Sequence, residues 1–197
     1  GGSDPTSGIA SNPSIGVASN LLVDEGGSSI LSETTEVIGA EHLLATRFED
    51  EEMKDKFLKF VSDVEKRAIA MGEDLRSGQP TPGNKAGGLS TIEEKSLGCM
   101  YKAGNKPFKG ALEYADIVPP DKKGLYFMDT PGQDIDSITG MVAGGAQIVI
   151  FSTGRGTPTG SPISPVIKIT GNSDTYNKMP DNIDINAGRI ITDGAKI

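Results

Sequence analysis

The sequence predicts an α/β fold, a layered sandwich with a mainly parallel sheet and helices on both faces. Short apolar runs rich in β-branched residues, typical of buried strands, alternate with stretches of helical periodicity, and the links between them are short. Polar or glycine residues follow one predicted strand after another. Ligands of open α/β sheets bind where the carboxyl ends of strands meet, so we expect a site there. The predicted strands cover residues 28–31, 125–128, 148–151 and 166–169.

Capping signals place the helices. Asn12 and Pro13 predict a helix start, with asparagine as N-cap and proline at the first helical position. The loop of residues 1–8 is therefore expected at a helix N-terminus, where unpaired N–H groups favour anions. The clearest helix, about 50–71, carries one apolar stripe and is predicted to pack on the core. Further helices are predicted up to Leu44, after a capping box formed by Ser90 with Glu93 or Thr91 with Glu94, and over residues 135–142.

The chain of 197 residues is long enough to bury a full core. Its expected organisation is an N-terminal α/β portion (1–75), a Pro/Gly-rich loop (76–90) and a C-terminal α/β portion (91–197), packed together as one domain. The sequence starts on Gly1 without methionine and shows no closing helix, so we expect a piece of a longer protein.

Composition excludes several classes of function. The net charge of −8 argues against nucleic acid and anionic membranes as partners. No apolar run approaches the length of a membrane span. The single Cys99 rules out a disulfide framework and favours a reducing, cytoplasmic compartment. His42 is the only histidine and no Gly-x-Ser-x-Gly elbow accompanies it, which excludes serine hydrolase chemistry.

The stretch that follows the strand at 148–151 is the first candidate site. That strand is predicted to be buried on both faces, and it runs into Ser152, Thr153 and then Arg155 between two glycines. One interpretation is a surface turn with a solvated arginine; the other is a guanidinium and bare N–H groups presented to a ligand. The loop of residues 76–88 has the same two interpretations, as a flexible connector or as a binding loop that carries Asn84 and Lys85.

Several long motifs together resemble the altronate/galactarate dehydratase family. They are the segments 81–98, 152–158, 165–170 and 184–188, with the opening Gly1-Gly2-Ser3-Asp4. The likeness covers nearly the whole chain. It implies a sugar-acid dehydratase that depends on a divalent metal, often iron, and a small N-terminal domain outside this sequence. The family pattern commonly has a cysteine just before the Gly-Gly-Ser-Asp segment, where this sequence starts.

The resemblance implies a β-elimination in which a base removes the proton α to a carboxylate and the β-hydroxyl departs. Strong cations must bind that carboxylate, and Arg155 suits a bidentate clamp. Lys85 is the candidate base if burial favours its neutral form, and a second anchor otherwise. Hard oxygen ligands for Fe²⁺ or Mn²⁺ are expected from Asp4, Glu33 and Glu36, although the glutamates equally suit ordinary helix-start acids. Substrate-binding residues are expected to be Ser3, Asn84, Gly87, Gly88, Thr153, Gly154, Gly156 and Asn186.

The predicted function is metal-assisted removal of water from an aldonate or aldarate, such as altronate or galactarate, to give a 2-keto-3-deoxy acid. Two alternatives stay open: a carbon–sulfur lyase subunit of the sulfolactate sulfo-lyase type, which shares the α-proton abstraction, and a non-catalytic sugar-acid binding module. The expected partners are the small-molecule substrate and a small N-terminal domain or separate small subunit. A homo-oligomer is compatible with the sequence.

Overall fold

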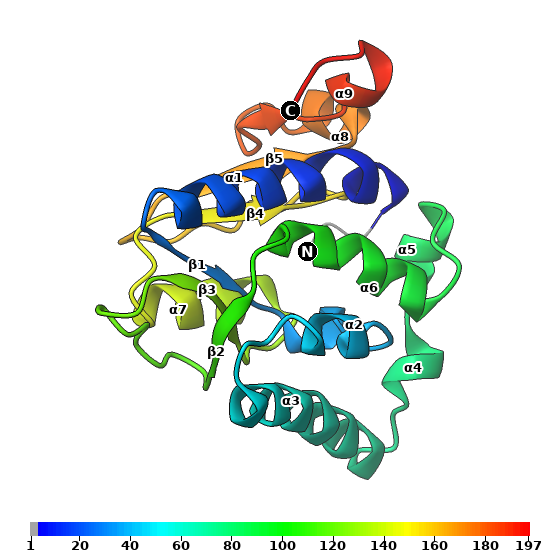
Figure 1. Ribbon diagram of the computed structural model, residues 1–197. Helices are drawn as coiled ribbons and strands as arrows, with labels where there is room; N and C mark the ends of the chain where they lie inside the picture. The colour runs from blue at the N-terminus through cyan, green and yellow to red at the C-terminus, as the bar shows by residue number, and fades with distance from the viewer. Residues whose placement is uncertain (1–3) are drawn as a thin grey trace.

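The computed structural model describes residues 4–197. In that part of the chain, short strands form two three-stranded sheets in which every pairing is parallel (Figure 1). The first sheet has the order β1-β3-β2 and the second β4-β5-β6. The expected α/β layers are confirmed, with two sheets in place of one. The strands are β1 Ser28–Leu31, β2 Phe108–Leu112, β3 Gly124–Met128, β4 Val149–Ser152, β5 Val166–Thr170 and β6 Ile185–Asn186.

Helices surround both sheets. The longer ones are α1 Asn12–Asp24, α3 Glu51–Ala70, α6 Ile92–Met100 and α7 Asp134–Ala143. The shorter ones are α2 Glu41–Ala45, α4 Leu75–Gly78, α5 Pro82–Ala86, α8 Ser173–Lys178 and α9 Arg189–Thr192. A π-helix, η1 Ser7–Ser11, and two 3-10 helices, η2 Thr34–Glu36 and η3 Tyr101–Ala103, complete the elements. No helix of residues 4–197 is both long and apolar enough to cross a membrane.

The core of the first sheet is built on the alternation of side chains along β3. Leu125 and Phe127 face a cluster with α3, whose stripe is buried as predicted. Phe57 of α3 meets Phe127 edge-on at 4.7 Å between ring centroids. Tyr126 and Met128 point to the opposite face, into a second cluster that contains residues of α7 and of β4. The first sheet therefore carries helices on both faces, and α7 reaches from it to the second sheet.

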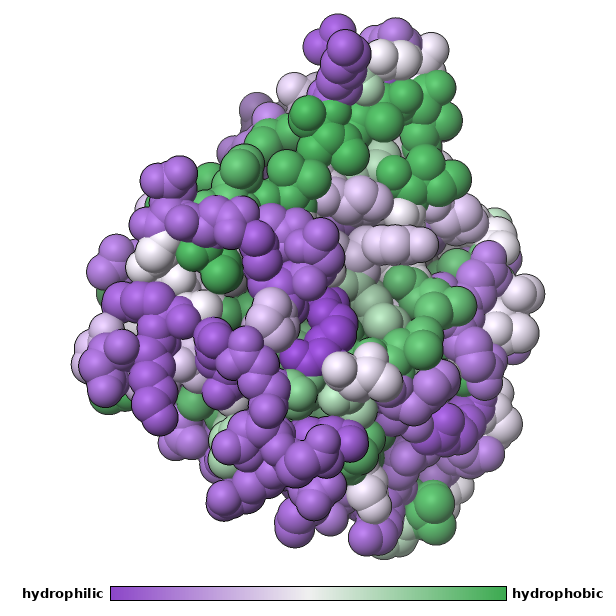
Figure 2. All heavy atoms as spheres, viewed as in Figure 1, coloured by the Kyte–Doolittle hydropathy of each residue, from purple (hydrophilic) through white to green (hydrophobic). Residues whose placement is uncertain are grey.

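Helix α1 lies along both sheets (Figure 1). The Ser11 hydroxyl, just before the helix, shares a hydrogen bond of 2.9 Å with the Ser152 hydroxyl at the end of β4. Near the other end, the Ser19 hydroxyl donates to Ser29 Oγ on β1 at 2.8 Å. Figure 2 shows apolar surface concentrated around α1 and the end of the chain, and polar surface around α3. The first helical segment thus bonds to the second sheet near its start and to the first sheet near its end.

Helix α1 begins at Asn12, as predicted, but Asn12 is not its N-cap, because the chain is already helical before this residue. Helical structure begins at Pro5, runs through the π-helix η1, and continues into α1. Asn12 is fully buried, and its Nδ2 donates to the Gly98 carbonyl at 2.9 Å. A widened π turn directly before Pro13 lets the helix pass a residue that has no N–H to donate. The first turn is capped by Asp4, whose Oδ1 accepts from Ser7 N at 2.7 Å.

Other boundaries also differ from the prediction. The loop 76–90 contains the short helices α4 and α5, and strand β2 was not predicted because Lys109 and Gly110 interrupt its apolar pattern. Strand β4 is not buried on both faces, since 39% of Ile150 is exposed. The helix expected up to Leu44 is limited to α2 after a 3-10 turn. Of the two registers of the capping box, Thr91 with Glu94 is the one formed.

Candidate functional site

A cavity of about 300 Å³ lies where β4 and β5 end, next to the start of the first helix and α5. We call it the site cavity. Arg155 follows β4, and Asn172 follows β5, which is the position at which ligands of parallel sheets are bound. Five residues predicted from the sequence come together here: Asp4, Asn84, Gly87, Gly154 and Arg155. The remaining lining residues are Gly83, Asn172, Thr175, Lys178 and Met179.

Glycines allow the parts of the site cavity to approach closely. A Cβ atom at Gly154 would lie 2.0 Å from Asp4 Oδ2, far inside contact distance. A Cβ atom at Gly83 would lie 2.6 Å from Arg155 Nη1, so the guanidinium lies directly against the α5 backbone. Because no side chain stands between them, the arginine, the aspartate and the α5 turn share one small space.

Arg155 is available to a ligand. Its residue is exposed, and it forms no ion pair or hydrogen bond with another residue of the described chain. The guanidinium presents its donors in a planar fork that matches a carboxylate. Of the two interpretations of this arginine, a ligand site fits better than a solvated turn, because Asp4, Asn84 and Lys178 line the same cavity.

Three lining residues of the second sheet's loop and helix were missed by the sequence analysis. Asn172 Oδ1 accepts from Asp174 N at 2.9 Å and so caps α8. The Thr175 hydroxyl donates to the Gly154 carbonyl at 2.8 Å and fixes the glycine before the arginine. Lys178 adds a second exposed cation to the cavity. The available signal was Asn172, two residues after the end of β5. The helix that follows has six residues and no apolar periodicity, so no pattern in the sequence indicated Thr175 and Lys178 as site residues beside it.

Some predicted residues lie near the site cavity without lining it. Lys85 is exposed on α5, so the burial that its role as a base required is not present in this chain. Gly88, at φ +108°, packs against Pro5. Ser3 lies outside the described residues.

Other predicted residues support the backbone. Thr153 is buried, and its hydroxyl accepts from Gly156 N at 3.0 Å. Gly156, at φ +88°, lies against Met179, where a Cβ atom would approach the sulfur to 2.2 Å. Asn186 lines a different cavity beside α9, and its Oδ1 accepts from Gly188 N at 3.0 Å. These residues shape the loops around the cavity more than its surface.

Glu33 and Glu36 belong to a separate, buried cluster at the end of β1. Lys102 Nζ lies 3.1 Å from Glu33 Oε2, and Lys95 Nζ lies 2.9 Å from Glu36 Oε1. Glu33 also has a left-handed backbone, at φ 72°, which is costly for a residue other than glycine. Its main-chain N–H donates to the Thr130 hydroxyl at 2.9 Å, which ties this strained turn to the end of β3.

Several groups of this cluster have pKa values that are shifted from their ordinary ones. Burial alone would raise the pKa of Glu33, but surrounding positive charge, led by Lys102, outweighs it and holds the pKa at about 2. Burial opposes the charged form of Lys102, yet the anionic groups around it, including Glu33 and Glu36, raise its pKa above the ordinary value. Burial also raises the pKa of the Cys99 thiol beside them. Glu33 and Lys102 are therefore a charged pair at neutral pH.

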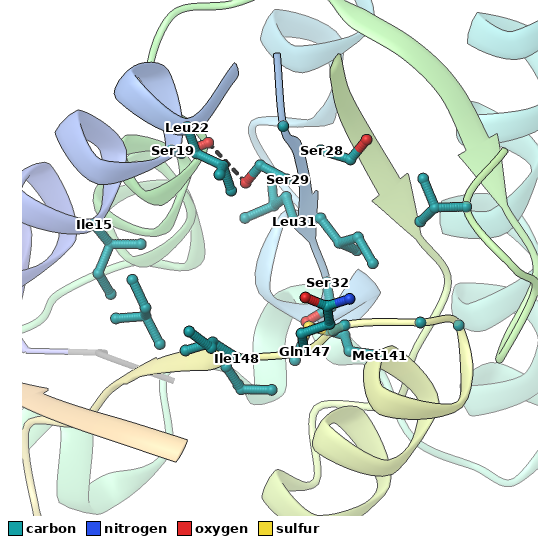
Figure 3. Close-up of a pocket in the computed structure, with 18 of the residues that line it drawn as sticks. Ile15, Ser19, Leu22, Ser28, Ser29, Leu31, Ser32, Met141, Gln147 and Ile148 are labelled. Atoms are coloured by element: carbon teal, nitrogen blue, oxygen red, sulfur yellow. Dashed lines mark hydrogen bonds between the residues drawn. The ribbon is translucent and has the colours of Figure 1, made fainter. Parts of the chain in front are cut away.

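A second, larger cavity of about 550 Å³ includes this pair in its lining. Glu33 and Lys102 are among the residues that line it. Most of the remaining lining comes from β1, β4, α1, α7 and the segment that leads into β4 (Figure 3), together with Ile117, Val118, Pro120 and Lys123 from the segment between β2 and β3. We call this larger cavity the slot.

Comparison with known proteins identifies the family of this chain. All of residues 1–197 match the family model described as D-galactarate/altronate dehydratase, C-terminal. The chain belongs to this dehydratase family. The resemblance seen in the sequence motifs is thereby confirmed, and the part of the family that this chain represents is the C-terminal one.

Relatives of this dehydratase family member include enzymes with different substrates. The chain is 42% identical over 193 residues to an altronate dehydratase of Bacillus subtilis strain 168, covering 98% of this chain and 38% of the relative. It is 41% identical over 192 residues to a galactarate dehydratase (L-threo-forming) of Escherichia coli K12, covering 98% and 36%. It is 35% identical over 196 residues to the subunit beta of a (2R)-sulfolactate sulfo-lyase from Chromohalobacter salexigens, covering 97% and 49%. The chain thus spans less than half the length of each of these relatives.

The divalent metal expected of the dehydratase lacks a complete ligand set in residues 4–197. No group of three or more histidine, cysteine, aspartate and glutamate side chains is placed there to hold an ion. Lysines neutralise Glu33 and Glu36, and of the three predicted ligands only Asp4 lines the site cavity. The described residues do not make a metal centre by themselves.

Proposed function

We propose that the full-length protein is a sugar-acid dehydratase, which removes water from an aldonate or aldarate such as altronate or galactarate to give a 2-keto-3-deoxy acid. The observation that carries the proposal is Arg155, which shares the site cavity with Asp4 and Asn84 and has no ion pair among the described residues. Its support from outside the cavity is the family match over the whole chain.

In this proposal Arg155 binds the substrate carboxylate with two parallel hydrogen bonds. Removal of the α proton moves negative charge onto that carboxylate, and the arginine stabilises the resulting enediolate more strongly than the substrate. The enediolate then expels the β-hydroxyl, which leaves as water once protonated. The enol that remains takes up a proton at carbon 3 and loses its hydroxyl proton to become the 2-keto-3-deoxy acid. Asn84 and Asn172 supply amide groups for the hydroxyls of the chain of the sugar acid, and Lys178 suits the far carboxylate of an aldarate.

A divalent metal, Fe²⁺ or Mn²⁺, stays part of the proposal for the full-length protein. Asp4 is the residue of this chain that would join ligands from elsewhere, because its carboxylate lines the site cavity. Titration of each ion into the full-length protein and its Asp4→Asn variant tests this. A weaker affinity in the variant is expected, and an unchanged affinity would remove Asp4 from the ligand set.

Substrate class is tested with the full-length protein, incubated with altronate, galactarate and sulfolactate, with and without added Fe²⁺. Formation of a 2-keto-3-deoxy acid from altronate or galactarate supports the proposal. Release of sulfite from sulfolactate alone would replace it by the carbon–sulfur lyase, which the sulfo-lyase relative at 35% identity favours as the second candidate. Binding of sugar acids without turnover would support the non-catalytic module.

The small N-terminal domain or small subunit is likewise a proposal, since this chain covers 36–49% of the relatives it matches. We also propose that the protein forms a homo-oligomer. Exposed apolar side chains of the first helix, among them Ile9 and Leu21, offer surface for such contacts.

A further inference from the structure

The slot separates two strand edges that have no partner on that side. Strand β1 pairs only with β3, and β4 pairs only with β5, so each is the edge of its own sheet in the described chain. Both edges line the same cavity of about 550 Å³. In the close-up, Ser28, Ser29 and Leu31 of β1, Ile148 beside β4, Ile15 and Leu22 of α1, and Met141 of α7 surround this space (Figure 3).

The two edges run in the same direction. Ser152, at the end of β4, is bonded to Ser11 at the start of α1, whereas Ser29, near the start of β1, is bonded to Ser19 toward the end of α1. Strand β1 is therefore antiparallel to α1, which is consistent with its place directly after that helix in the chain. Strand β4 ends where α1 begins, and Ile150 of β4 and Ala18 of α1, each farther from that point, line a common cavity. Both strands thus present their carboxyl ends on the side of Glu33 and the site cavity.

Backbone groups of β4 point into the slot. Val149 N donates to the Pro165 carbonyl at 2.9 Å, and Thr153 N donates to the Ile169 carbonyl at 3.0 Å. Because residues of a parallel strand alternate between their two neighbours, the N–H groups of Ile150 and Ser152 point away from β5. N–H groups along a strand edge can donate to the carbonyl groups of an added strand, so this edge is suited to an acceptor strand.

The walls of the slot complement an extended peptide. One face is covered by α1 and the other by α7, so the space has the position of one strand in a sheet with helices on both sides. Its apolar side chains are incompletely covered, with 58% of Ile148 and 39% of Ile150 exposed. Backbone donors in a row, flanked by apolar side chains, are the surface on which an added β-strand binds.

We propose that an extended segment from the remainder of the full-length polypeptide inserts between β1 and β4 and joins the two sheets into one. The chain covers 38% of the altronate dehydratase of Bacillus subtilis, so a family member of that length has ample polypeptide to supply the segment. A second copy of this chain would have to bring an exposed strand of its own past α1 and α7. The inference rests on the family membership and the geometry, not on the proposed substrate.

The inserted segment would also reach the functional region. Glu33 and Lys102 line the slot where β1 ends, so the segment passes beside their ion pair. The remainder of the protein would thereby fix the position of the first sheet relative to the second. Glu33 follows a strand of the first sheet and Arg155 follows a strand of the second. This gives the rest of the protein a structural role at the site in addition to any residues that it contributes.

Residue-resolved hydrogen exchange in the full-length protein tests the pairing. The amides of Ile150 and Ser152 are expected to exchange as slowly as that of Val149, which is already bonded to β5. Rapid exchange at both positions, with slow exchange at Val149, would show that β4 remains an edge and would overturn the proposal. Substrate can be absent throughout, so the outcome is independent of the proposed activity.

A matched pair of variants tests the walls. Ile148→Asp places a charge in the slot, and Ile163→Asp places the same charge at a position that is 81% exposed and outside it. In the full-length protein, Ile148→Asp is expected to lower the thermal midpoint by at least about 3 °C more than Ile163→Asp. Equal midpoints would overturn the proposal. A halved molecular mass with Ile148→Asp would assign the slot to a second copy, and a raised KM at an unchanged midpoint would assign it to substrate.

Discussion

We expect the Arg155 side chain to contribute little to the stability of this chain, because it is exposed. Its guanidinium lies against the Gly83 backbone, and no described residue neutralises it. Glycines on both sides, one fixed by Thr175 and the other by Thr153, hold the backbone that carries it. A cation positioned in this way, before any ligand arrives, loses little freedom on binding a carboxylate.

Arg155→Lys keeps the charge but removes the planar fork. In the full-length enzyme we expect kcat/KM to fall at least about a hundredfold, on the scale of about 3 kcal/mol for a lost transition-state donor. The thermal midpoint is expected to stay within about 1 °C, since the head group is not in the core. A variant that melts early and keeps its specific activity would show that Arg155 is a structural brace.

The Glu33–Lys102 pair is expected to show the asymmetry of buried ion pairs. Lys102→Met leaves the Glu33 carboxylate buried without that lysine and should destabilise the protein by about 3–5 kcal/mol. The double variant Glu33→Gln/Lys102→Met should cost less than the single Lys102→Met, because no buried charge remains at the pair. Denaturation of the three proteins measures this, and a double variant that is less stable than Lys102→Met would contradict it.

The lowered pKa of Glu33 predicts that the stability of the folded protein decreases in acid. Its pKa in the folded chain is about 2, against an ordinary value of 4.5. A depressed pKa contributes stability that is complete above pH 4.5 and is lost as the pH falls from there toward 2. Thermal midpoints of the wild type and Glu33→Gln should therefore converge over this range. A difference that stays constant from pH 7 down to pH 3 would show that Glu33 does not titrate in this way.

At the scale of elements, the close approach of α1 and η3 is fixed by glycine. A Cβ atom at Gly16 would lie 2.1 Å from the Tyr101 carbonyl oxygen and 3.0 Å from Gly104 N, both backbone atoms. These contacts leave no flexible side chain that could move away. The junction matters because η3 contains Lys102, the partner of Glu33.

Gly16→Ala should therefore destabilise the protein by at least about 2 kcal/mol, although alanine in a helix is by itself favourable by about 1 kcal/mol. Gly78→Ala is the control, because nothing lies within 4 Å of its Cβ position and it also lies in a helix, α4. We expect Gly78→Ala to be neutral or slightly stabilising. Equal effects of the two substitutions in thermal denaturation would mean that α1 can shift away from η3 at little cost.

Elements with a continuous apolar pattern were predictable. The stripe of α3 and the runs of β3 and β5 were placed within one or two residues, because burial dictates their residue types. Strand β2 was missed because Lys109 and Gly110 interrupt it. Helix α1 was predicted, but the helical turns before it, which include the π-helix η1, were not. These features depend on tertiary contacts, such as Asn12 with the Gly98 carbonyl, that local sequence does not show.

The site was predictable where a motif carried it. Arg155 was predicted from its place between two glycines after a strand, Asn84 and Asp4 lie in segments that carry the family resemblance, and the three residues line one cavity. Asn172 and Lys178 were missed because no pattern marked α8. The lysine partners of Glu33 and Glu36 come from α6 and η3, far along the chain, so the glutamates could equally be predicted as metal ligands or helix-start acids. Pairing across such distances is set by the fold.

At the scale of the whole molecule, the two sheets depend on α1, α7 and their contacts for their relative position. We expect residues 1–197, expressed alone, to unfold cooperatively but to turn over little or no sugar acid, since part of the site and the slot's occupant would lie elsewhere in the full-length protein. Calorimetry and an activity assay of this piece beside the full-length protein check both statements. Near-full activity of the piece would contradict the second.

The most direct measurement is a crystal structure of the full-length protein with a sugar acid bound. A substrate carboxylate is expected in the site cavity, with both oxygens about 2.7–3.1 Å from the Arg155 guanidinium nitrogens. Asn84 and Asp4 should lie around the same ligand. A carboxylate bound in the slot beside Lys102, with Arg155 in solvent, would contradict the account.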